Sequence, residues 1–169
     1  ALEGTEKAAA LMDMELGRAE VVILGATGSI GSACARILAK KVNYLTLVAR
    51  NTGRLEDLAG KIIAETGLAV KVASDVKNAV QRADIIVPED LKPGAIVCDV
   101  ARPRDVSAGV LEKRDDVLII EGGVVQVPGD VDFNFNFGFP PKMAYACMAE
   151  TMILALEKRY ESFSLGKEM

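Results

Sequence analysis

The feature that most constrains this chain is a glycine-rich turn placed between an apolar strand and a helix. Residues 21–34 read VVILGATGSIGSAC, in which four apolar residues lead into Gly25, and Gly28 and Gly31 follow. Glycine tolerates positive φ and lets backbone N–H groups approach a phosphate at the positive end of the next helix. This order of strand, turn and helix predicts a dinucleotide site, and a structural turn without a ligand is the alternative.

Helical and strand patterns alternate on both sides of this turn. We expect strands over 21–24, 44–49, 69–73, 84–87, 95–100 and 117–121, and helices over 29–40, 55–65 and 76–83. Strands joined by helical crossovers form parallel sheets with right-handed connections. The pattern therefore predicts an α/β protein with a doubly wound parallel sheet, the Rossmann fold, flanked by N-terminal and C-terminal helices.

We divide the chain into a connecting helix (1–18), a nucleotide-binding domain (19–139) and a C-terminal helix (140–169). A helical pattern over 5–16 leads directly into the first strand, and we expect it to connect to an upstream domain that this sequence lacks. After Val87 the fourth strand passes into Pro88 with almost no loop, so we expect residues to be missing there; a deleted loop is the alternative. A long helix is expected over 142–160, after a Pro-Pro break.

Composition excludes several classes of function. The 169 residues carry a net charge of −4 without a basic stripe, so we expect no nucleic-acid partner. No apolar run approaches the roughly 20 residues of a membrane-spanning helix, and we expect a cytoplasmic protein. There is no histidine, and the three cysteines share no CxxC spacing, so no metal site is expected.

The residues after the second strand indicate which dinucleotide binds. An acidic residue there favours NAD(H), whereas a cation favours the 2′-phosphate of NADP(H). The sequence reads VARNTGR, and a guanidinium can bind a phosphate through charge-assisted hydrogen bonds. We therefore expect NADPH (NADP) as cofactor, although solvated surface arginines are the alternative. The candidate cofactor-binding residues are Gly25, Ala26, Thr27, Gly28, Ser29, Ile30, Gly31, Arg50, Asn51 and Arg54.

One of the cysteines is a candidate nucleophile. Cys34 and Cys98 lie in apolar patterns and read as small core residues. Cys147 lies in PPKMAYACMAETM, shortly after Lys142 and Tyr145, and a position near a helix start favours thiolate. Spacing alone still favours a structural role for Cys147, because small residues are common on apolar helix faces.

Several segments together resemble one enzyme family. GATGSIGSACARIL, LVARNTGRL, IIEGGVVQVPGD and above all FPPKMAYACMAETMILALEKRYESFSLGK are similar to the C-terminal half of long-chain acyl-[acyl-carrier-protein] reductases, which form fatty aldehydes. The resemblance covers nearly all of this chain but about half of the family's length. It implies that Cys147 attacks an acyl thioester, carried by acyl carrier protein or coenzyme A, and that NADPH reduces the acyl-enzyme to an aldehyde. Lys142 and Tyr145 are then candidates for polarising the oxyanion.

Two other interpretations remain open. A dehydrogenase of the shikimate or methylenetetrahydrofolate type also has a KPGAIVCDV-like fifth strand and needs no cysteine. The other is a non-catalytic NADP-binding module. The acyl chain length, the carrier and the oligomeric state stay open, with a homo-oligomer possible. For the Phe-rich stretch over 131–139, core burial is the simpler expectation, and packing at an interface is the alternative.

Overall fold

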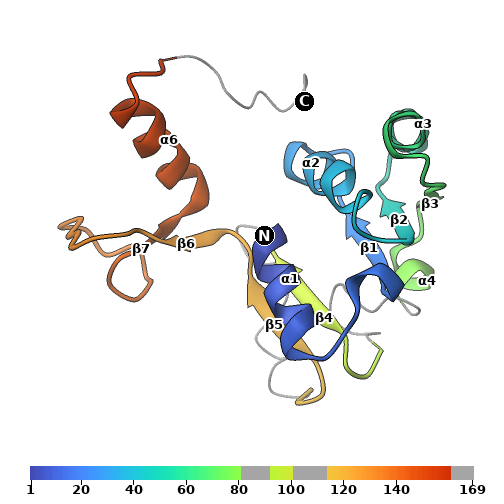
Figure 1. Ribbon diagram of the computed structural model, residues 1–169, viewed down its shortest axis with the longest axis horizontal. Coiled ribbons are helices and arrows are strands. Elements are labelled where there is room, and N and C mark those ends of the chain that lie inside the picture. The colour runs from blue at the N-terminus through green and yellow to red at the C-terminus, as the bar shows by residue number, and fades with distance from the viewer. Residues whose placement is uncertain (81–91, 101–113, 161–169) are drawn as a thin grey trace.

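The computed structural model describes residues 1–80, 92–100 and 114–160 (Figure 1). A three-stranded parallel sheet has the order β1-β2-β3, and β4 pairs in parallel with β5. The predicted strand over 84–87, the residues on either side of it and the C-terminal residues 161–169 lie outside the described residues. The elements that build this part of the fold are β1 (Glu20–Leu24), α2 (Ser29–Leu38), β2 (Tyr44–Val48), α3 (Thr52–Thr66), β3 (Lys71–Ala73), α4 (Val76–Val80), β4 (Ile96–Asp99) and β5 (Leu118–Glu121).

The parallel sheet is covered on both faces, which confirms the predicted α/β, doubly wound architecture. Val21 of β1 packs into a cluster with residues of α2 and α3, whereas its neighbour Val22 packs with Val48 and Ala79 on the opposite side. Side chains alternate between the faces of a strand, so apolar residues at consecutive positions require cover on both sides. Helices α2 and α3 therefore cover one face and α4 contacts the other (Figure 1).

Helix α3 has clear capping signals at both ends. The side chain of Asn51 accepts a hydrogen bond from the backbone N–H of Arg54 at 3.1 Å, and Gly67 closes the helix with φ +75°. Arg36 of α2 donates two hydrogen bonds to Glu65 of α3, at 3.0 and 2.6 Å. These hydrogen bonds lower the pKa of Glu65 and hold the two helices together at the surface.

The N-terminal helix is shorter than predicted. Helix α1 (Leu2–Leu11) ends five residues before Leu16, and a 3-10 helix, η1 (Leu16–Arg18), leads into β1. The prediction of a helix to Leu16 is wrong because Asp13 adopts φ +51°, while the N–H of Met14 bonds to the carbonyl of Ala9 at 2.8 Å. This left-handed end is a Schellman motif. Helix α1 contacts β4 and β5.

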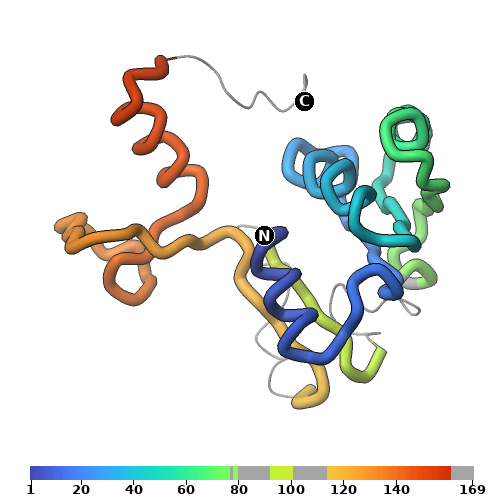
Figure 2. Tube along the Cα trace, in the orientation of Figure 1, coloured from blue at the N-terminus to red at the C-terminus, as the bar shows by residue number. Residues whose placement is uncertain are grey.

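The C-terminal region projects from the sheet. Strand β6 (Val124–Gln126) pairs antiparallel with β7 (Met143–Tyr145), and α6 (Ala146–Leu156) follows directly. We call residues 124–156 the C-terminal arm, and residues 127–142, which join the two strands, the phenylalanine loop. Figure 2 shows the arm extending from the end of β5, away from β1, β2 and β3.

The predicted helix over 142–160 is too long at both ends, because α6 spans only Ala146–Leu156. Lys142 has φ +66°, which no right-handed helix accommodates, and residues 143–145 form β7 instead. Tyr145 is the N-cap of α6, with extended φ −61° and ψ 138°. The helices in the described part of the chain are all too short or too polar to form a membrane span.

Candidate functional site

The glycine turn adopts the geometry that the sequence predicts. Gly25 has φ +63°, in the left-handed region, and the N–H of Gly28 donates to the carbonyl of Gly25 at 2.9 Å. The N–H of Ala26 donates to the carbonyl of Val48 at 3.1 Å, which ties the turn to the end of β2. Gly28 is the N-cap of α2, so the first N–H groups of α2 have no acceptor within the helix and can bind an anion.

Gly31 is required for the close approach of α2 to this turn. A Cβ atom at this position would lie 2.4 Å from the carbonyl oxygen of Gly25 and 2.9 Å from the Cα of Ala26. Both are backbone atoms, which cannot rotate away as a flexible side chain can. The helix therefore packs on the turn only because residue 31 lacks a side chain.

A cleft of about 440 Å³ opens where β1 and β2 end. It brings together Gly25, Thr27, Gly28, Arg50 and Asn51 of the predicted cofactor residues. Of the others, Ala26, Ser29, Ile30 and Gly31 belong to the turn and the first turn of α2 and do not line the cleft, and Arg54 is exposed on α3. The full lining is Leu24, Gly25, Thr27, Gly28, Val48, Ala49, Arg50, Asn51, Ser74 and Val76.

The cleft suits a phosphate-bearing ligand. No lining residue within the described part of the chain carries a carboxylate, and Arg50 is the cation at the end of β2. Asn51 also has a structural role, because its side-chain oxygen caps α3. Sequence reasoning missed Ser74, although its position directly after β3, at the same sheet edge as Arg50, is a signal for a ligand-contacting residue.

Cys147 is the second residue of α6 and is exposed. The N–H of Ala146 donates to the carbonyl of Gly123 at 3.0 Å, which anchors the start of α6 beside β6. The hydroxyl of Thr151 donates to the carbonyl of Cys147 at 2.9 Å, one turn further on. The thiol is thus presented to solvent at the N-terminal end of a helix, rather than buried in an apolar face.

Lys142 and Tyr145 lie before α6 and not on it. The Nζ of Lys142 is 2.8 Å from Oδ1 of Asp130, so the lysine pairs across the ends of the phenylalanine loop. The ring of Tyr145 packs edge-to-face on Phe139, with centroids 4.9 Å apart. Of the two residues, only Tyr145 adjoins the start of α6.

The other two cysteines are half-buried, and their surroundings differ from that of Cys147. Burial raises the pKa of the Cys34 thiol, which disfavours the nucleophilic thiolate. The thiol of Cys98 donates to the carbonyl of Ala1 at 3.7 Å, and a Cβ on Gly122 would lie 2.6 Å from its Sγ. Both thiols contact other parts of the fold, but neither residue is in the core, where the sequence placed them.

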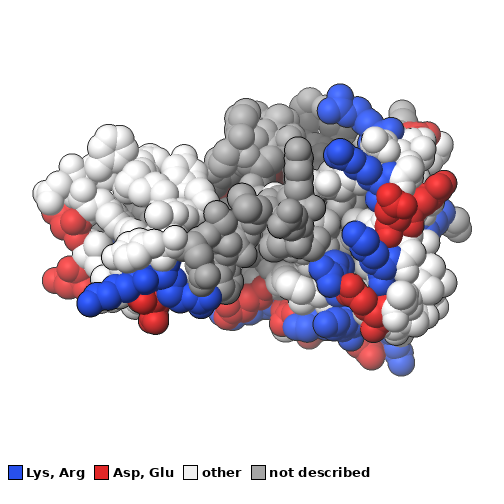
Figure 3. Space-filling view, turned by 90° about the horizontal axis from the view of Figure 1, so that it is seen from above, with Lys and Arg blue, Asp and Glu red and all other residues white. Residues whose placement is uncertain are grey.

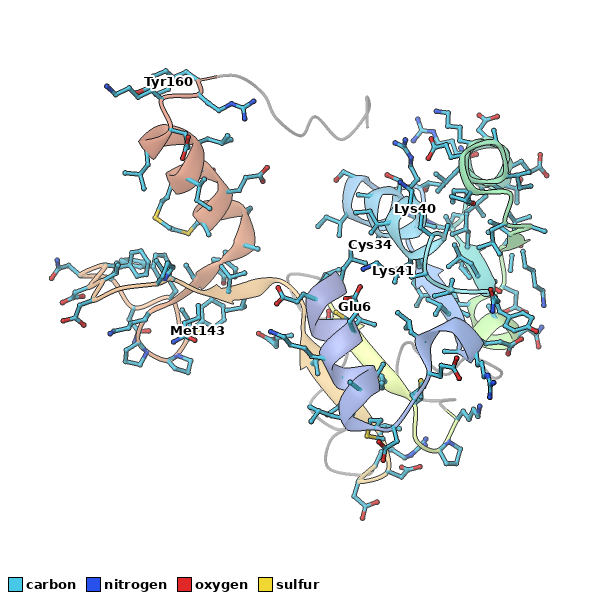
Figure 4. The ribbon with its side chains drawn as sticks, viewed as in Figure 1. Glu6, Cys34, Lys40, Lys41, Met143 and Tyr160 are labelled. Atoms are coloured by element: carbon cyan, nitrogen blue, oxygen red, sulfur yellow. The ribbon has the colours of Figure 1, made fainter. Side chains whose placement is uncertain are left out.

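The structure does not bring Cys147 to the nucleotide cleft. The cleft lies at the ends of β1 and β2, whereas α6 contacts β6 and β7 of the arm. Figure 1 places α6 and the glycine turn on opposite sides of the molecule, and Figure 4 shows the same separation between Met143 of β7 and Cys34 of α2.

In the described ranges, no group of three or more Cys, Asp or Glu side chains is arranged to hold a metal ion.

Comparison with curated proteins finds partial relatives. Aminotransferase PigE from a Serratia species is 34% identical over an alignment of 170 positions, which covers 92% of this chain and 20% of that protein. Long-chain acyl-[acyl-carrier-protein] reductase from Synechococcus elongatus is 32% identical over an alignment of 179 positions, which covers 96% of this chain and 50% of that protein. Bifunctional protein FolD from Staphylococcus saprophyticus is 26% identical over an alignment of 122 positions, which covers 70% of this chain and 39% of that protein. The chain thus spans half or less of each relative, and no family profile matches it.

Two solved structures with NADP-type ligands match a segment of this chain. An alcohol dehydrogenase from Thermococcus sibiricus, complexed with 5-hydroxy-NADP, is 41% identical over 36% of this chain and 27% of its own, with a TM-score of 0.31. A short-chain dehydrogenase from Sphingobium yanoikuyae in complex with NADPH is 32% identical over 40% of this chain and 32% of its own, with a TM-score of 0.35. Scores this low assign neither a whole fold nor a ligand.

Proposed function

We propose that this chain is the nucleotide-binding part of an NADPH-dependent reductase that converts a long-chain acyl thioester to a fatty aldehyde through an acyl group on Cys147. The observation that carries the proposal is the exposed thiol of Cys147 at the second position of α6, in a chain that also has a glycine turn built for a dinucleotide. Similarity to the Synechococcus elongatus reductase, over 96% of this chain, supports the acyl thioester as substrate.

The cleft beside the glycine turn is the proposed cofactor site. The first N–H groups of α2 would hold the pyrophosphate, and Arg50 would bind the 2′-phosphate that distinguishes NADPH from NADH. Gly31 supports this fit, since any side chain there would push α2 off the turn. When bound, NADPH supplies the hydride that reduces the acyl group.

The thiol of Cys147 performs the first half of the reaction. Its thiolate forms a bond to the acyl carbon, the bond from that carbon to the carrier sulfur breaks, and the carrier leaves as a thiol after taking up a proton. The acyl oxygen becomes negative during this exchange, and the N–H groups of Cys147 and Met148, in the first turn of α6, would stabilise it, since the N–H of Ala146 donates to the carbonyl of Gly123. Tyr145, adjoining this turn, is a second candidate donor, whereas Lys142 is paired with Asp130. The carrier is acyl carrier protein or coenzyme A.

Reduction releases the second product and restores the thiol. The bond between the acyl carbon and Sγ breaks, the aldehyde leaves, and Cys147 recovers its proton. This half requires the acyl carbon to reach the cofactor. Because Cys147 and the cleft lie apart in this chain, they must come together during turnover.

Intact-mass measurement tests the acyl-enzyme directly. The natural full-length protein is incubated with palmitoyl coenzyme A without NADPH, as wild type, as Cys147→Ser and as Cys34→Ser. We expect an acyl-sized adduct on wild type and on Cys34→Ser, and none on Cys147→Ser. Equal adducts on all three proteins, or none on any, contradict covalent catalysis at Cys147.

The separation of Cys147 from the cleft favours a second candidate, a dehydrogenase that transfers hydride directly between NADPH and its substrate. Such an enzyme needs the nucleotide cleft but not the thiol of Cys147. Full activity of Cys147→Ser toward an alcohol or ketone substrate, with no thioester turnover by wild type, would select it.

A further inference from the structure

The phenylalanine loop has a regular two-residue pattern. Four of the five phenylalanines of the chain occupy every second position from 133 to 139, and Asn or Gly separates them. The polar residues build the backbone turns: Oδ1 of Asp132 accepts from the N–H of Asn134 at 2.8 Å, and Oδ1 of Asn136 accepts from the N–H of Gly138 at 2.7 Å. Asn134 and Gly138 both have positive φ. Polar side chains are thus used to shape the loop, and the rings are left to contact one another.

The rings form a continuous row. Phe137 packs edge-to-face against Phe133 at 5.6 Å and against Phe135 at 4.9 Å, between ring centroids. On its other side Phe137 contacts Tyr145 at 6.4 Å, and Phe139 contacts the same tyrosine at 4.9 Å. The row runs from Phe135, whose exposed fraction is 69%, to the residue that caps α6.

These phenylalanines are not core residues, so the expectation of core burial is wrong. Phe135 is exposed, and the other three are half-buried. They instead line a cavity of about 640 Å³, within the range of small-molecule sites. Figure 3 shows a broad uncharged surface at this end of the molecule, with Lys, Arg, Asp and Glu along its edges, and a denser mixture of charged side chains at the opposite end. The lining is residues 131–137 and 139–143, in which Asp132, Asn134, Asn136 and Lys142 lie among the apolar side chains.

We propose that this cavity binds the acyl chain of the substrate, next to the thiol that carries its carbonyl carbon. The inference rests on the proposed function, and it adds the site that selects for long chains. The row of rings ends on Tyr145, two residues before Cys147, so a chain lying along the rings has its thioester end at the start of α6. The four phenylalanines, two prolines, Val131 and Met143 give the cavity an apolar part that suits a flexible acyl chain. Of the polar residues in its lining, Asp132 and Asn136 accept hydrogen bonds from the loop backbone, and Lys142 pairs with Asp130. Each methylene group buried there adds about a fourfold gain in affinity.

The first test compares chain lengths. Rates of Cys147 acylation by palmitoyl and by butyryl coenzyme A are measured by intact mass for wild type, Phe135→Ala and Phe137→Ala in the natural full-length protein. The matched control is Tyr44→Ala, another exposed aromatic residue, which lies on β2 far along the chain from the arm. We expect the two loop variants to lose at least about tenfold in the palmitoyl rate with the butyryl rate unchanged, and the control to lose neither. Equal losses for both chain lengths, or no loss, overturn the proposal.

The second test separates this proposal from the proposed function. Binding of cis-parinaric acid, a fluorescent fatty acid, is titrated into Cys147→Ser with and without Phe135→Ala. Weaker binding in the double variant supports an acyl-chain site even if no acyl-enzyme ever forms. Equal binding in both variants, together with normal acylation of wild type, is consistent with the proposed reductase function but refutes the acyl-chain site. A loop variant that changes only the oligomeric state, by light scattering, assigns the rings to an interface between copies and also refutes it.

Discussion

Gly31 lies so close to Gly25 that a single added methyl group would overlap the carbonyl oxygen of the turn, at 2.4 Å. This contact joins the start of α2 to the end of β1, the two elements that form the predicted dinucleotide site. It also provides a pair of matched substitutions, because Gly60 lies within α3 with no atom that an added Cβ would meet within 4 Å.

Gly31→Ala should therefore destabilise the fold and weaken nucleotide binding together. Overpacking against backbone atoms costs about 1–3 kcal/mol in the free energy of unfolding. Gly60→Ala should have no such cost and should raise stability by up to about 1 kcal/mol, because alanine is the better helix former. Urea unfolding of both variants, with NADPH titration by calorimetry, checks this; equal effects of the two substitutions would show that the contact is unimportant.

Arg50→Glu should reverse the preference between the two dinucleotides. A carboxylate at the end of β2 repels the 2′-phosphate of NADPH and accepts a hydrogen bond from the 2′-hydroxyl of NADH. Loss of a charge-assisted contact predicts about a tenfold or greater drop in NADPH affinity. Arg54 is exposed on α3 and lies outside the cleft lining, so Arg54→Glu should change the ratio of NADPH affinity to NADH affinity little. If both variants shift the ratio equally, general surface charge explains it instead of a contact at Arg50.

Cys147 should react with iodoacetamide before Cys34. The first thiol is exposed, whereas the second is half-buried with a pKa raised by burial, and alkylation needs both access and thiolate. Peptide mass mapping after short exposure near neutral pH measures the order directly. Preferential labelling of Cys34 would mean that the two thiols have the opposite accessibilities to those in this structure.

The raised pKa of Cys34 also predicts a pH dependence of stability. A thiol that holds its proton more tightly in the folded chain favours folding fully below its unfolded pKa of about 8.5, and this contribution is lost as pH rises through the folded pKa. The free energy of unfolding should then fall with pH above about 8.5 in wild type and in Cys147→Ala, and less steeply in Cys34→Ala. Urea titrations in reducing buffer give the three slopes; identical slopes would exclude this role for Cys34.

Much of the sheet could be predicted because local signals and tertiary packing agree there. The glycine spacing after Leu24 sets the turn, and apolar residues on consecutive positions of β1 require a sheet covered on both faces. Asn51 and Gly67 mark the ends of α3 with capping chemistry that can be read from the sequence.

The C-terminal region could not be predicted in the same way. Residues 142–145 precede a true helix and contain good helix formers, but β7 is fixed by its antiparallel pairing with β6, a contact distant in sequence. The positive φ of Lys142 belongs to the loop closure that this pairing requires. The cavity of the phenylalanine loop and the distance between Cys147 and the cleft likewise depend on the path of the chain after Glu121, where Gly122 and Gly123 indicate a turn but not its direction.

Isotope transfer tests the central claim, that one protein carries an acyl group on Cys147 and reduces it with NADPH. The natural full-length protein is first acylated with a palmitoyl thioester, freed of excess substrate, and then mixed with NADPH deuterated at both C4 positions. The account predicts that the adduct mass disappears while palmitaldehyde with one deuterium at its aldehyde carbon appears in equal amount. An adduct that persists, or an aldehyde without deuterium, would contradict it.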